Sequence, residues 1–304
     1  MDMSETRKRP KVYIILVNYN GFSDTIECVE SLLAVAYPNF EIVVVDNAST
    51  VQPSQGQMNY LQEHTHFIAL PQNTGFSGGN NKGIRYALQE QADYVLLLNN
   101  DTVVKPDFLD ALVTCAERIP NIGCVIGRIL FYDEPETVWY GGGEFCEQDA
   151  SVEHTFWGKR IDEIESQDKS REVTFATGCL MLIPAEAIKK TGLLSEEYFL
   201  YSEDADFSRR LTLEGYMLYY SRDAVIYHKV SRSTGASSGN TQYYVLRNKL
   251  IMIKKYGKDK EHAYCKVLAR TAKDLVKKRI QWKPAAWAIF DFVAGRNGKN
   301  IHEF

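Results

Sequence analysis

The sequence lacks the features that mark secreted and membrane-spanning proteins. Its six cysteines are scattered without CxxC spacing, which indicates neither a zinc knuckle nor a disulfide framework. The charged stretch 1–11 leads directly into a short apolar segment, and no apolar run is long enough for a signal peptide or a membrane span. We therefore expect free thiols in a reducing compartment and a cytoplasmic protein.

Signatures of several ligand classes are missing as well. The Gly-rich stretch 73–83 matches neither the GxGxxG pattern of dinucleotide enzymes nor the GxxxxGK(S/T) phosphate loop, so both classes lose support. The basic C-terminal residues belong to no recognisable nucleic-acid-binding module and are not interleaved with aromatic residues in the way such modules require. We expect no nucleic-acid partner.

Charge of the two signs is unevenly divided along the chain. Residues 1–245 carry 20 Lys and Arg against 34 Asp and Glu, whereas residues 246–304 carry 15 against 5, giving net charges of −14 and +10. A basic tail on an acidic body indicates contact with an anionic partner, either a membrane surface or a polyphosphate-linked substrate. The tail carries an apolar stripe from Tyr264 to Leu275 opposite Lys266 to Lys277, which suits peripheral membrane contact or packing against the body.

The hydrophobic pattern predicts one large α/β domain with an appendage. Uncharged runs at 12–17, 40–45 and 94–98 have the character of buried parallel strands, with a helix between the first two. Further strands are expected at 123–131, at 173–183 with an interruption at Gly178, at 215–220 and at 224–227. We predict a flexible N-terminus at 1–10, a catalytic body at 11–242 and a basic helical region at 243–304.

Two other segments are expected to be irregular. The polar stretch 132–172 is long for a loop inside a compact domain, so we interpret it as a lid or an acceptor-facing loop. The glycines of 73–83 precede a helix predicted at 84–90, where they let the backbone approach a ligand and leave helix N–H groups for an anion. A flexible loop without a ligand remains the alternative.

Polar side chains follow the strands at the edge where ligands of α/β sheets collect. Asn99 and Asp101 can supply oxygen ligands to Mg²⁺ or Mn²⁺, although Asn-Asn-Asp also suits a polar turn. Asp46 is placed to accept hydrogen bonds from a nucleotide base or ribose, or to cap the next segment. Three carboxylates at 203–206 fit both a stabilised helix N-terminus and a catalytic base.

Taken together, these motifs resemble those of glycosyltransferase family 2, and more narrowly its rhamnosyltransferase-like branch, which includes galactofuranosyltransferases. The resemblance covers about residues 11–250 and rests on the ordered stretches 17–20, 45–49, 73–83, 98–101, 177–179 and 199–210. It implies the GT-A nucleotide-diphospho-sugar transferase fold, in which helices flank a Rossmann-like, mostly parallel sheet. It also implies a nucleotide-sugar donor, a divalent metal (Mn²⁺ or Mg²⁺) and inversion at the anomeric carbon.

The resemblance also assigns roles to individual residues. Asp204 matches the catalytic base, and Glu203 is expected to bind hydroxyls of the acceptor or donor. Metal ligands would be Asp101, His228 and Asn99, the last standing where many members have aspartate. Gly178, Cys179 and Glu203 would face the acceptor. The donor would be bound by Val17, Asn18, Asn20, Asp46, Asn73, Gly75, Phe76, Asn80, Asn81, Asn99 and Asn100.

The implied reaction is transfer of a sugar to a hydroxyl of a cell-envelope or capsular polysaccharide precursor. We expect dTDP-rhamnose as donor, with UDP-hexose or UDP-galactofuranose as the alternative, and a glycan or lipid-linked oligosaccharide as acceptor. A nucleotidyltransferase is disfavoured because Asn18 to Gly21 lacks its Gly-rich basic signature. A non-catalytic nucleotide-sugar-binding module is disfavoured because Glu203, Asp204 and Asp101 are all retained.

Overall fold

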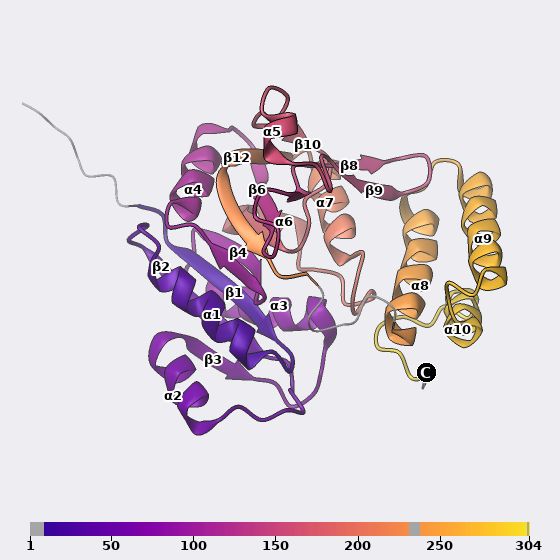
Figure 1. Cartoon of the computed structure of the whole chain (residues 1–304), viewed down its shortest axis with the longest axis horizontal. Coiled ribbons are helices and arrows are strands. Elements are labelled where there is room, and N and C mark those ends of the chain that lie inside the picture. Colours follow the sequence, from indigo (N-terminus) through magenta and orange to yellow (C-terminus); the bar gives the residue numbers. More distant parts are fainter. Residues whose placement is uncertain (1–8, 231–237, 303) are drawn as a thin grey trace, which may run out of the picture.

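A mixed β-sheet runs through the main body of the protein. The computed structural model describes residues 9–230, 238–302 and 304, so most of the segment predicted to be flexible at 1–10 lies outside the described residues. The strands follow the order β10-β12-β6-β11-β4-β1-β2-β3, with β5 paired to β12 and β7 to β6. Helices pack on the sheet, and a group of three C-terminal helices stands to one side of it (Figure 1).

The N-terminal half of the sheet is parallel, as the alternation of strands and helices predicts. It consists of β1 (Val12–Asn18), β2 (Phe40–Asp46), β3 (His66–Ala69) and β4 (Tyr94–Asn99). The connecting helices are α1 (Phe22–Leu33), α2 (Gln55–His64) and α3 (Gly75–Gln89). Asn18 pairs with Asp46 and Val17 with Asn99, so the polar ends of three strands meet at one edge.

The other half of the sheet mixes strand directions. β11 (Leu180–Pro184) runs antiparallel to β4, and β6 (Ile122–Phe131) runs parallel to β12 (Met217–His228). β5 (Thr102–Val104), β7 (Val138–Tyr140) and β10 (Arg171–Val173) are short additions. The helices here are α4 (Phe108–Arg118), α5 (Ile161–Ile164), α6 (Ala185–Thr191) and α7 (Glu203–Leu213). The GT-A expectation of a mostly parallel sheet with flanking helices is confirmed.

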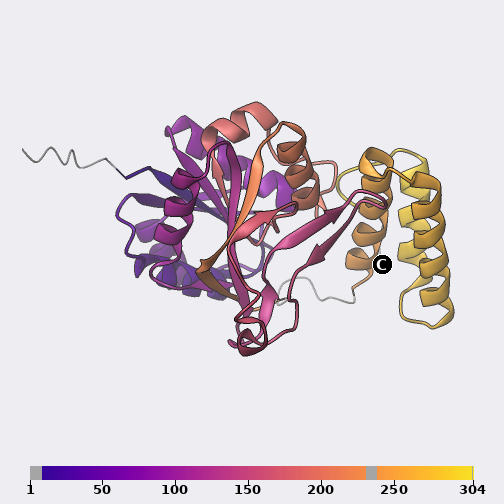
Figure 2. The same ribbon diagram turned by 90° about the horizontal axis from the view of Figure 1, so that it is seen from above.

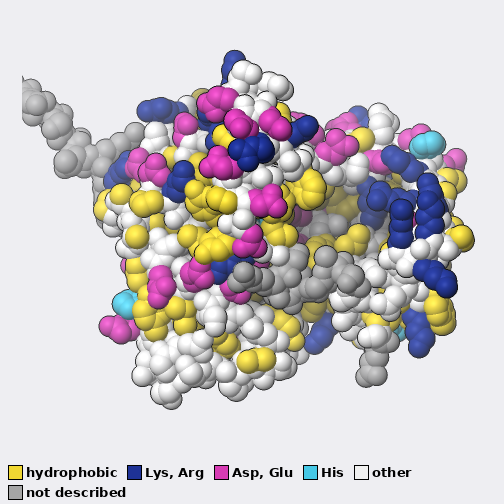
Figure 3. All heavy atoms as spheres, in the orientation of Figure 1, with side chains coloured by type: hydrophobic (Ala, Val, Ile, Leu, Met, Phe, Trp, Pro, Cys, Tyr) yellow, Lys and Arg dark blue, Asp and Glu magenta, His cyan; other side chains and the backbone are white. Residues whose placement is uncertain are grey.

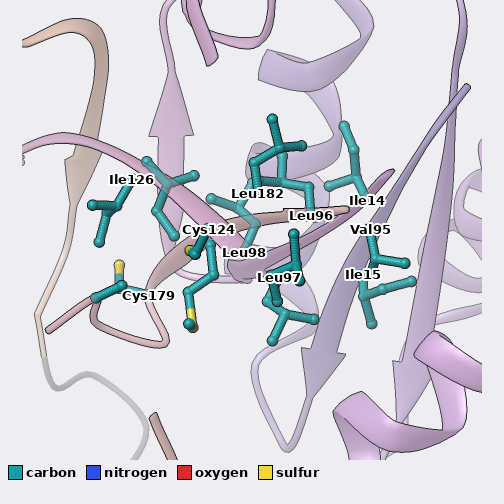
Figure 4. Close-up of a cluster of buried hydrophobic side chains, with 14 of the residues drawn as sticks. Ile14, Ile15, Val95, Leu96, Leu97, Leu98, Cys124, Ile126, Cys179 and Leu182 are labelled. Atoms are coloured by element: carbon teal, nitrogen blue, oxygen red, sulfur yellow. The ribbon is translucent and has the colours of Figure 1, made fainter. Parts of the chain in front are cut away.

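The hydrophobic core lies on the central strands of the sheet. Figure 4 shows side chains of β1 and β4 beside Leu182 of β11 and Ile126 of β6. Val95, Leu96 and Leu97 of β4 are fully buried, which explains why this strand is apolar on both faces. The core therefore fixes β4 as the rigid support for the polar residues that follow it.

The glycine-rich stretch is not the loop that we predicted. α3 begins at Gly75, so most of this stretch forms the first turns of a helix that starts nine residues before the predicted one. A Cβ on Gly83 would come within 2.3 Å of Ile15 Cγ2, and one on Gly79 within 2.8 Å of Val17 Cγ1. These glycines allow α3 to lie directly on β1, a role that the sequence pattern alone did not separate from ligand binding.

Two further segments differ from their predictions. The predicted interruption at Gly178 is present but wider than expected, because β10 ends at Val173 and β11 begins only at Leu180. The stretch 132–172 is largely ordered and contains β7, α5 and a hairpin of β8 (Gly143–Cys146) and β9 (Ser151–His154). The hairpin reaches the C-terminal helices, where Asp149 accepts hydrogen bonds from Lys249 and Lys266 (Figure 2).

The C-terminal region folds onto the body through α8 (Gly239–Tyr256). Fully buried Arg247 donates to the carbonyl of Tyr198, and Asn248 donates to those of Tyr198, Leu200 and Tyr201. α9 (Lys260–Val276) and α10 (Trp282–Val293) complete the group. None of the described helices is long and apolar enough to cross a bilayer.

The apolar stripe of α9 mostly faces its neighbours rather than solvent. Tyr264, Val267 and Leu275 pack with residues of α8 and α10, whereas Leu268 is 42% exposed. The stripe thus follows the packing alternative given by the sequence. All six cysteines are free, as expected, and Cys146 and Cys265 are exposed.

Asp206 on α7 joins the body to α8. Its fully buried carboxylate accepts hydrogen bonds from Tyr198, Arg210, Lys255 and Tyr256 at 2.7–3.1 Å. Burial raises the pKa of Asp206, but Lys255 and Arg210 outweigh burial, so the net pKa is lowered. Folded Asp206 thus holds its proton less tightly than unfolded Asp206, and its contribution to stability is present above the unfolded pKa.

We predict that Asp206→Asn lowers the free energy of unfolding at pH 7 by about 2–3 kcal/mol. Breaking a fully buried ion pair costs about 3–5 kcal/mol of stability. The loss expected here is smaller, because Lys255 is 33% and Arg210 24% exposed. The difference from wild type should begin to shrink as the pH falls below about 4, the pKa of unfolded Asp206, and should vanish only below the lowered pKa of folded Asp206. Denaturant unfolding across pH measures both effects. Asp162→Asn is the control, because the Asp162 side chain is 68% exposed. Equal stability of Asp206→Asn and wild type at pH 7 would contradict the stabilising role of Asp206.

Candidate active site

A cavity of about 800 Å³ opens at the carboxyl ends of β1 and β4. Its walls come from the strand ends, from the N-termini of α3 and α7, from the end of β12, and from α8 with the C-terminal tail. Twelve of the predicted site residues line it: Val17, Asn73, Gly75, Phe76, Asn99, Asn100, Asp101, Gly178, Cys179, Glu203, Asp204 and His228. The topology therefore brings together motifs that are separated by up to two hundred residues in the sequence.

A strained loop forms one wall of the cavity. Phe199, Tyr201 and Ser202 have φ values of 65°, 68° and 72°, a left-handed conformation that costs free energy for residues with a side chain. The loop lies on the start of α3, where Phe76 N–H donates to Phe199 O at 2.7 Å. Gly75, with φ 74°, is required there because a Cβ would lie 2.2 Å from Phe199 O. The strained loop ends where α7 begins, and so it fixes the position of Glu203 and Asp204.

Asp204 lies in the cavity wall with both carboxylate oxygens held by backbone groups. Oδ2 accepts from Gly178 N–H at 3.0 Å and Oδ1 from Ala205 N–H at 2.8 Å. Burial raises the pKa of Asp204, while these N–H groups oppose the rise. A carboxylate with a raised pKa that faces a cavity has the properties of a general base.

Glu203 is more deeply buried than Asp204. It is 5% exposed, and its Oε2 finds no hydrogen-bond partner among the described residues. Burial raises the pKa of Glu203 well above its usual range, and the neighbouring carboxylate of Asp204 adds to this. Both pKa values are raised, and that of Glu203 rises further, so Glu203 takes up a proton first and Asp204 remains the ionised member.

Asp101, in the turn between β4 and β5, and His228, the last residue of β12, form a buried pair. His228 Nε2 lies 3.2 Å from Asp101 Oδ1, and β5 pairs with β12 next to them. Asp101 Oδ1 and His228 Nδ1 make no hydrogen bond of good geometry to any described residue. Burial opposes protonation of His228, but the neighbouring Cys179 sulfur and Asp101 carboxylate outweigh it and raise its pKa to about 10.

These residues fit a divalent metal that is completed by a substrate. Asp101 Oδ1 is a buried carboxylate oxygen without a hydrogen bond, and the Asn99 side chain lies 3.5 Å from His228 Nε2. Across 9–230 and 238–302, no group of three or more His, Cys, Asp or Glu side chains gathers as a metal cluster. Mg²⁺ and Mn²⁺ are often held by one or two protein ligands with phosphate oxygens in the other positions, which is the arrangement that this pair permits.

Three predicted donor-binding residues lie beside the cavity rather than in its lining. Asn18 is fully buried and donates to Asp46 Oδ1 at 2.8 Å, while its own Oδ1 accepts from Thr25. Asp46 also accepts from Ser49 Oγ, so part of its hydrogen-bonding capacity is used within the protein. Asn20 Oδ1 accepts the N–H groups of residues 50 and 51. The second oxygen of Asp46, Oδ2, accepts the N–H of Ser49 at 3.3 Å, and the side chain as a whole is half-buried.

The structure places Asn80 and Asn81 away from the cavity lining, in structural roles. Asn81 is 1% exposed, donates to Leu194 O and Glu196, and accepts Leu194 N–H at 3.0 Å. Asn80 Nδ2 donates to Phe76 O within α3. The family resemblance implies donor contacts for both residues, but in α3 their side chains bond to other protein groups and do not line the cavity.

The cavity also contains residues that sequence reasoning missed. Trp139 and His154 reach it from β7 and β9, and Tyr244, Asn300 and His302 reach it from α8 and the tail. His154 Nδ1 lies 3.2 Å from the carbonyl of Trp139, which can only accept, so Nδ1 carries the proton. Burial lowers the pKa of His154, which leaves a neutral ring. No sequence signal marked these residues, apart from the interpretation of 132–172 as acceptor-facing.

Comparison with known proteins identifies the family. A sequence model described as Glycosyl transferase family 2 matches residues 13–192, a range that includes Asp101 but ends before Asp204 and His228. A hexosyltransferase of low-salt glycan biosynthesis from Haloferax volcanii, Agl10, is 29% identical over 66% of this chain, and this chain spans 61% of its length. The dTDP-rhamnosyl transferase RfbF of Shigella flexneri is 22% identical over 80% of each chain.

A third relative is another glycosyltransferase, and solved glycosyltransferase structures share the fold. The N-acetylglucosaminyl-diphospho-decaprenol L-rhamnosyltransferase of Mycobacterium tuberculosis is 25% identical over 73% of this chain and 77% of its own. A mannosyltransferase of Pyrobaculum calidifontis, solved with GDP-Man and Mn²⁺, has a TM-score of 0.58 and 16% identity over 95% of this chain and 76% of its own.

GalNAc-T7, solved with UDP, GalNAc and Mn²⁺, has a TM-score of 0.61 and 15% identity over 89% of this chain and 58% of its own. At these identities the two structures support the fold alone. The family match covers more than half of the chain and includes most of β1 and all of β4, at whose carboxyl ends the cavity opens. The chain therefore belongs to glycosyltransferase family 2 and has the GT-A fold.

Proposed function

We propose that the protein is an inverting transferase that moves a hexose from a nucleoside-diphosphate-sugar to a hydroxyl of a cell-envelope or capsular glycan precursor. The observation that carries this proposal is Asp204, a carboxylate of raised pKa in the same cavity as the Asp101–His228 pair. One group accepts a proton, and the other suits a metal-bound diphosphate. Together they would supply the base and the leaving-group stabilisation for a direct displacement at the anomeric carbon.

In the proposed reaction, the acceptor hydroxyl attacks the anomeric carbon as the bond to the nucleoside diphosphate breaks. A hydroxyl is a poor nucleophile at neutral pH, so Asp204 takes its proton while the new bond forms. The backbone N–H groups of Gly178 and Ala205 hold the carboxylate in place. Glu203 binds a sugar hydroxyl, and a single displacement of this kind inverts the configuration.

Asp101 and His228, with Asn99 beside them, would hold a divalent metal, Mn²⁺ or Mg²⁺. When bound, such a metal stabilises negative charge on a leaving diphosphate as a Lewis acid. The donor would lie against Val17, Asn73, Gly75, Phe76 and Asn100, with Asp46 and Asn18 toward the base. The acceptor would approach Gly178 and Cys179.

Rhamnose is the first choice for the transferred sugar, with UDP-hexose or UDP-galactofuranose as the alternative donor. Two relatives are named as rhamnosyl transferases, and one of these names contains a diphospho-decaprenol acceptor. We extend these chemistries to this chain as a proposal, with residues 11–242 as the catalytic unit and 243–304 as an accessory region. We place the protein in the cytoplasm, in peripheral contact with the inner face of the membrane.

The donor is tested by the thermal stability of the protein with dTDP, UDP, GDP and CMP and their sugars, each with and without Mn²⁺. A ligand present at about 100 times its Kd stabilises the native state by about 2.7 kcal/mol, so the true donor raises Tm. We expect the largest increase with a dTDP compound and Mn²⁺. An increase with UDP compounds instead would select the alternative donor, and no increase with any of them would contradict the proposal.

Asp204→Asn is expected to reduce transfer by at least about 100-fold, because the amide cannot accept the acceptor proton. The variant should keep the donor-dependent increase in Tm. In the wild type, the rate should fall as the pH drops through the raised pKa of Asp204, above the usual value of about 4. Asp162→Asn is the control, and strong residual turnover of Asp204→Asn would rule out its role as base.

Asp101→Asn and His228→Ala are expected to remove the Mn²⁺-dependent part of the donor stabilisation. An amide keeps an oxygen but loses the charge that a hard cation requires, and alanine removes the second ligand. Melting curves without ligand show whether each variant is folded. If both variants respond to donor and Mn²⁺ as the wild type does, the metal does not bind at this pair.

A further inference from the structure

One face of α10 is apolar and uncovered in the structure. Pro284, Ala285 and Ala288 are buried against α8, while Trp282, Phe290 and Val293 are 67%, 50% and 77% exposed. These three residues, with exposed Ala286, repeat every three or four positions and so form a single stripe, which we call the α10 face. An apolar helix stripe of this kind is unusual on a protein surface unless it contacts something.

Cations surround the α10 face, especially at the turn that precedes it. Lys277 and Lys278 are exposed in the turn, next to Val276, which is 83% exposed. Lys283, the second residue of α10, is exposed as well. Alongside α9, a hollow of about 520 Å³ is lined by Ala269, Arg270, Lys273, Asp274 and Arg279. Its single carboxylate, Asp274, lies 3.8 Å from Arg270 and 3.6 Å from Arg279, so the hollow has an excess of positive charge. Figure 3 shows Lys and Arg side chains gathered over the C-terminal helices.

We propose that the α10 face and its basic surroundings dock on the surface of an anionic phospholipid bilayer. Trp282, Phe290 and Val293 would enter the headgroup region, where tryptophan is favoured because its ring is partly polar. The lysines of the turn and the hollow beside α9 would bind lipid phosphates. The α10 face is a different surface from the apolar stripe of α9 that the sequence suggested for membrane contact. The stripe of α9 packs largely against α8 and α10.

Charge favours a bilayer over a second copy of the chain. A two-fold dimer through the α10 face would place two regions of net charge +10 against each other, which is unfavourable. An anionic bilayer instead attracts this region and repels the body, whose net charge is −14. The same separation of charge would orient the molecule, with the α10 face toward the lipid and the sheet away from it.

This orientation bears on the acceptor, a step that rests on the proposed function. α10 packs on α8, and α8 supplies Asn240 and Tyr244 to the cavity, while the tail that follows α10 supplies Asn300 and His302. One layer of helix, about 8–10 Å between axes, therefore separates the α10 face from this wall of the cavity. Docking would hold the cavity close to the membrane surface, so the acceptor class that fits is a saccharide linked to a lipid.

The test is sedimentation of the full chain with vesicles of phosphatidylcholine that contain about 30% phosphatidylglycerol, against vesicles of phosphatidylcholine alone. We expect binding to the anionic vesicles only, and weaker binding as salt is raised. Trp282→Ser/Phe290→Ser should weaken binding at least about tenfold, because the variant loses two apolar side chains that would be buried in the bilayer. Lys277→Gln/Lys278→Gln/Lys283→Gln should do the same, since each lysine contributes about fivefold near an anionic surface.

Matched changes on the body serve as controls. Trp157→Ser removes an indole that is 59% exposed, and Lys82→Gln/Lys159→Gln/Lys169→Gln removes three exposed lysines. Both control proteins should bind vesicles as the wild type does. All variants should retain the wild-type Tm and its donor-dependent increase, so a failure of vesicle binding is distinguished from a failure of the proposed function.

Three results would overturn the proposal: no binding of the wild type to the anionic vesicles, binding of the α10 variant equal to that of the wild type, or equal loss in the body controls. Light scattering checks the competing occupant. A doubled mass that Trp282→Ser/Phe290→Ser abolishes, without vesicle binding, would assign the α10 face to a dimer interface instead.

Discussion

The arrangement of the active site depends on the register of β1. This strand is paired in parallel with β2 on one side and β4 on the other, so that Asn18 lies beside Asp46 and Val17 beside Asn99. Parallel strands that end together leave their polar continuations at one edge of the sheet. β11 then enters antiparallel to β4 and adds Gly178 and Cys179 to the same edge, where Cys179 O accepts Asn99 N–H at 3.0 Å. A shift of one residue in β1 would separate these groups.

Close packing then brings the carboxylate of Asp204 to this edge. α3 can lie against β1 because its glycines have no side chain, and the strained loop 199–202 lies in turn on the start of α3. Strain in that loop persists because Arg247 and Asn248 of α8 bind its carbonyls and those just before it. The C-terminal helices thus take part in holding Asp204, although they are distant from it in sequence.

The C-terminal helices also make the distribution of charge over the molecule uneven. The sheet body is acidic and the C-terminal region basic, and the β8–β9 hairpin joins the two through Asp149 and the lysines of α8 and α9. α8 both lines the cavity and packs against α10, so it connects the cavity to the α10 face. The proposed donor site and the proposed docking surface are therefore joined through one helix.

The family, the fold class, the strands β1, β2 and β4 and the polar residues at their ends could be predicted from the sequence, because buried parallel strands are continuous apolar runs with abrupt polar ends. The sequence pattern did not separate glycines that pack a helix from glycines that bind a ligand, and the family resemblance implied donor contacts for Asn80 and Asn81, which lie outside the cavity lining. It also missed Trp139 and His154, since nothing local marks a residue that enters a cavity from a distant hairpin. Only the tertiary structure decided which apolar stripe of the tail stays uncovered. The stripe of α9 and that of α10 have the same periodicity, and their difference depends on which neighbour each helix packs against.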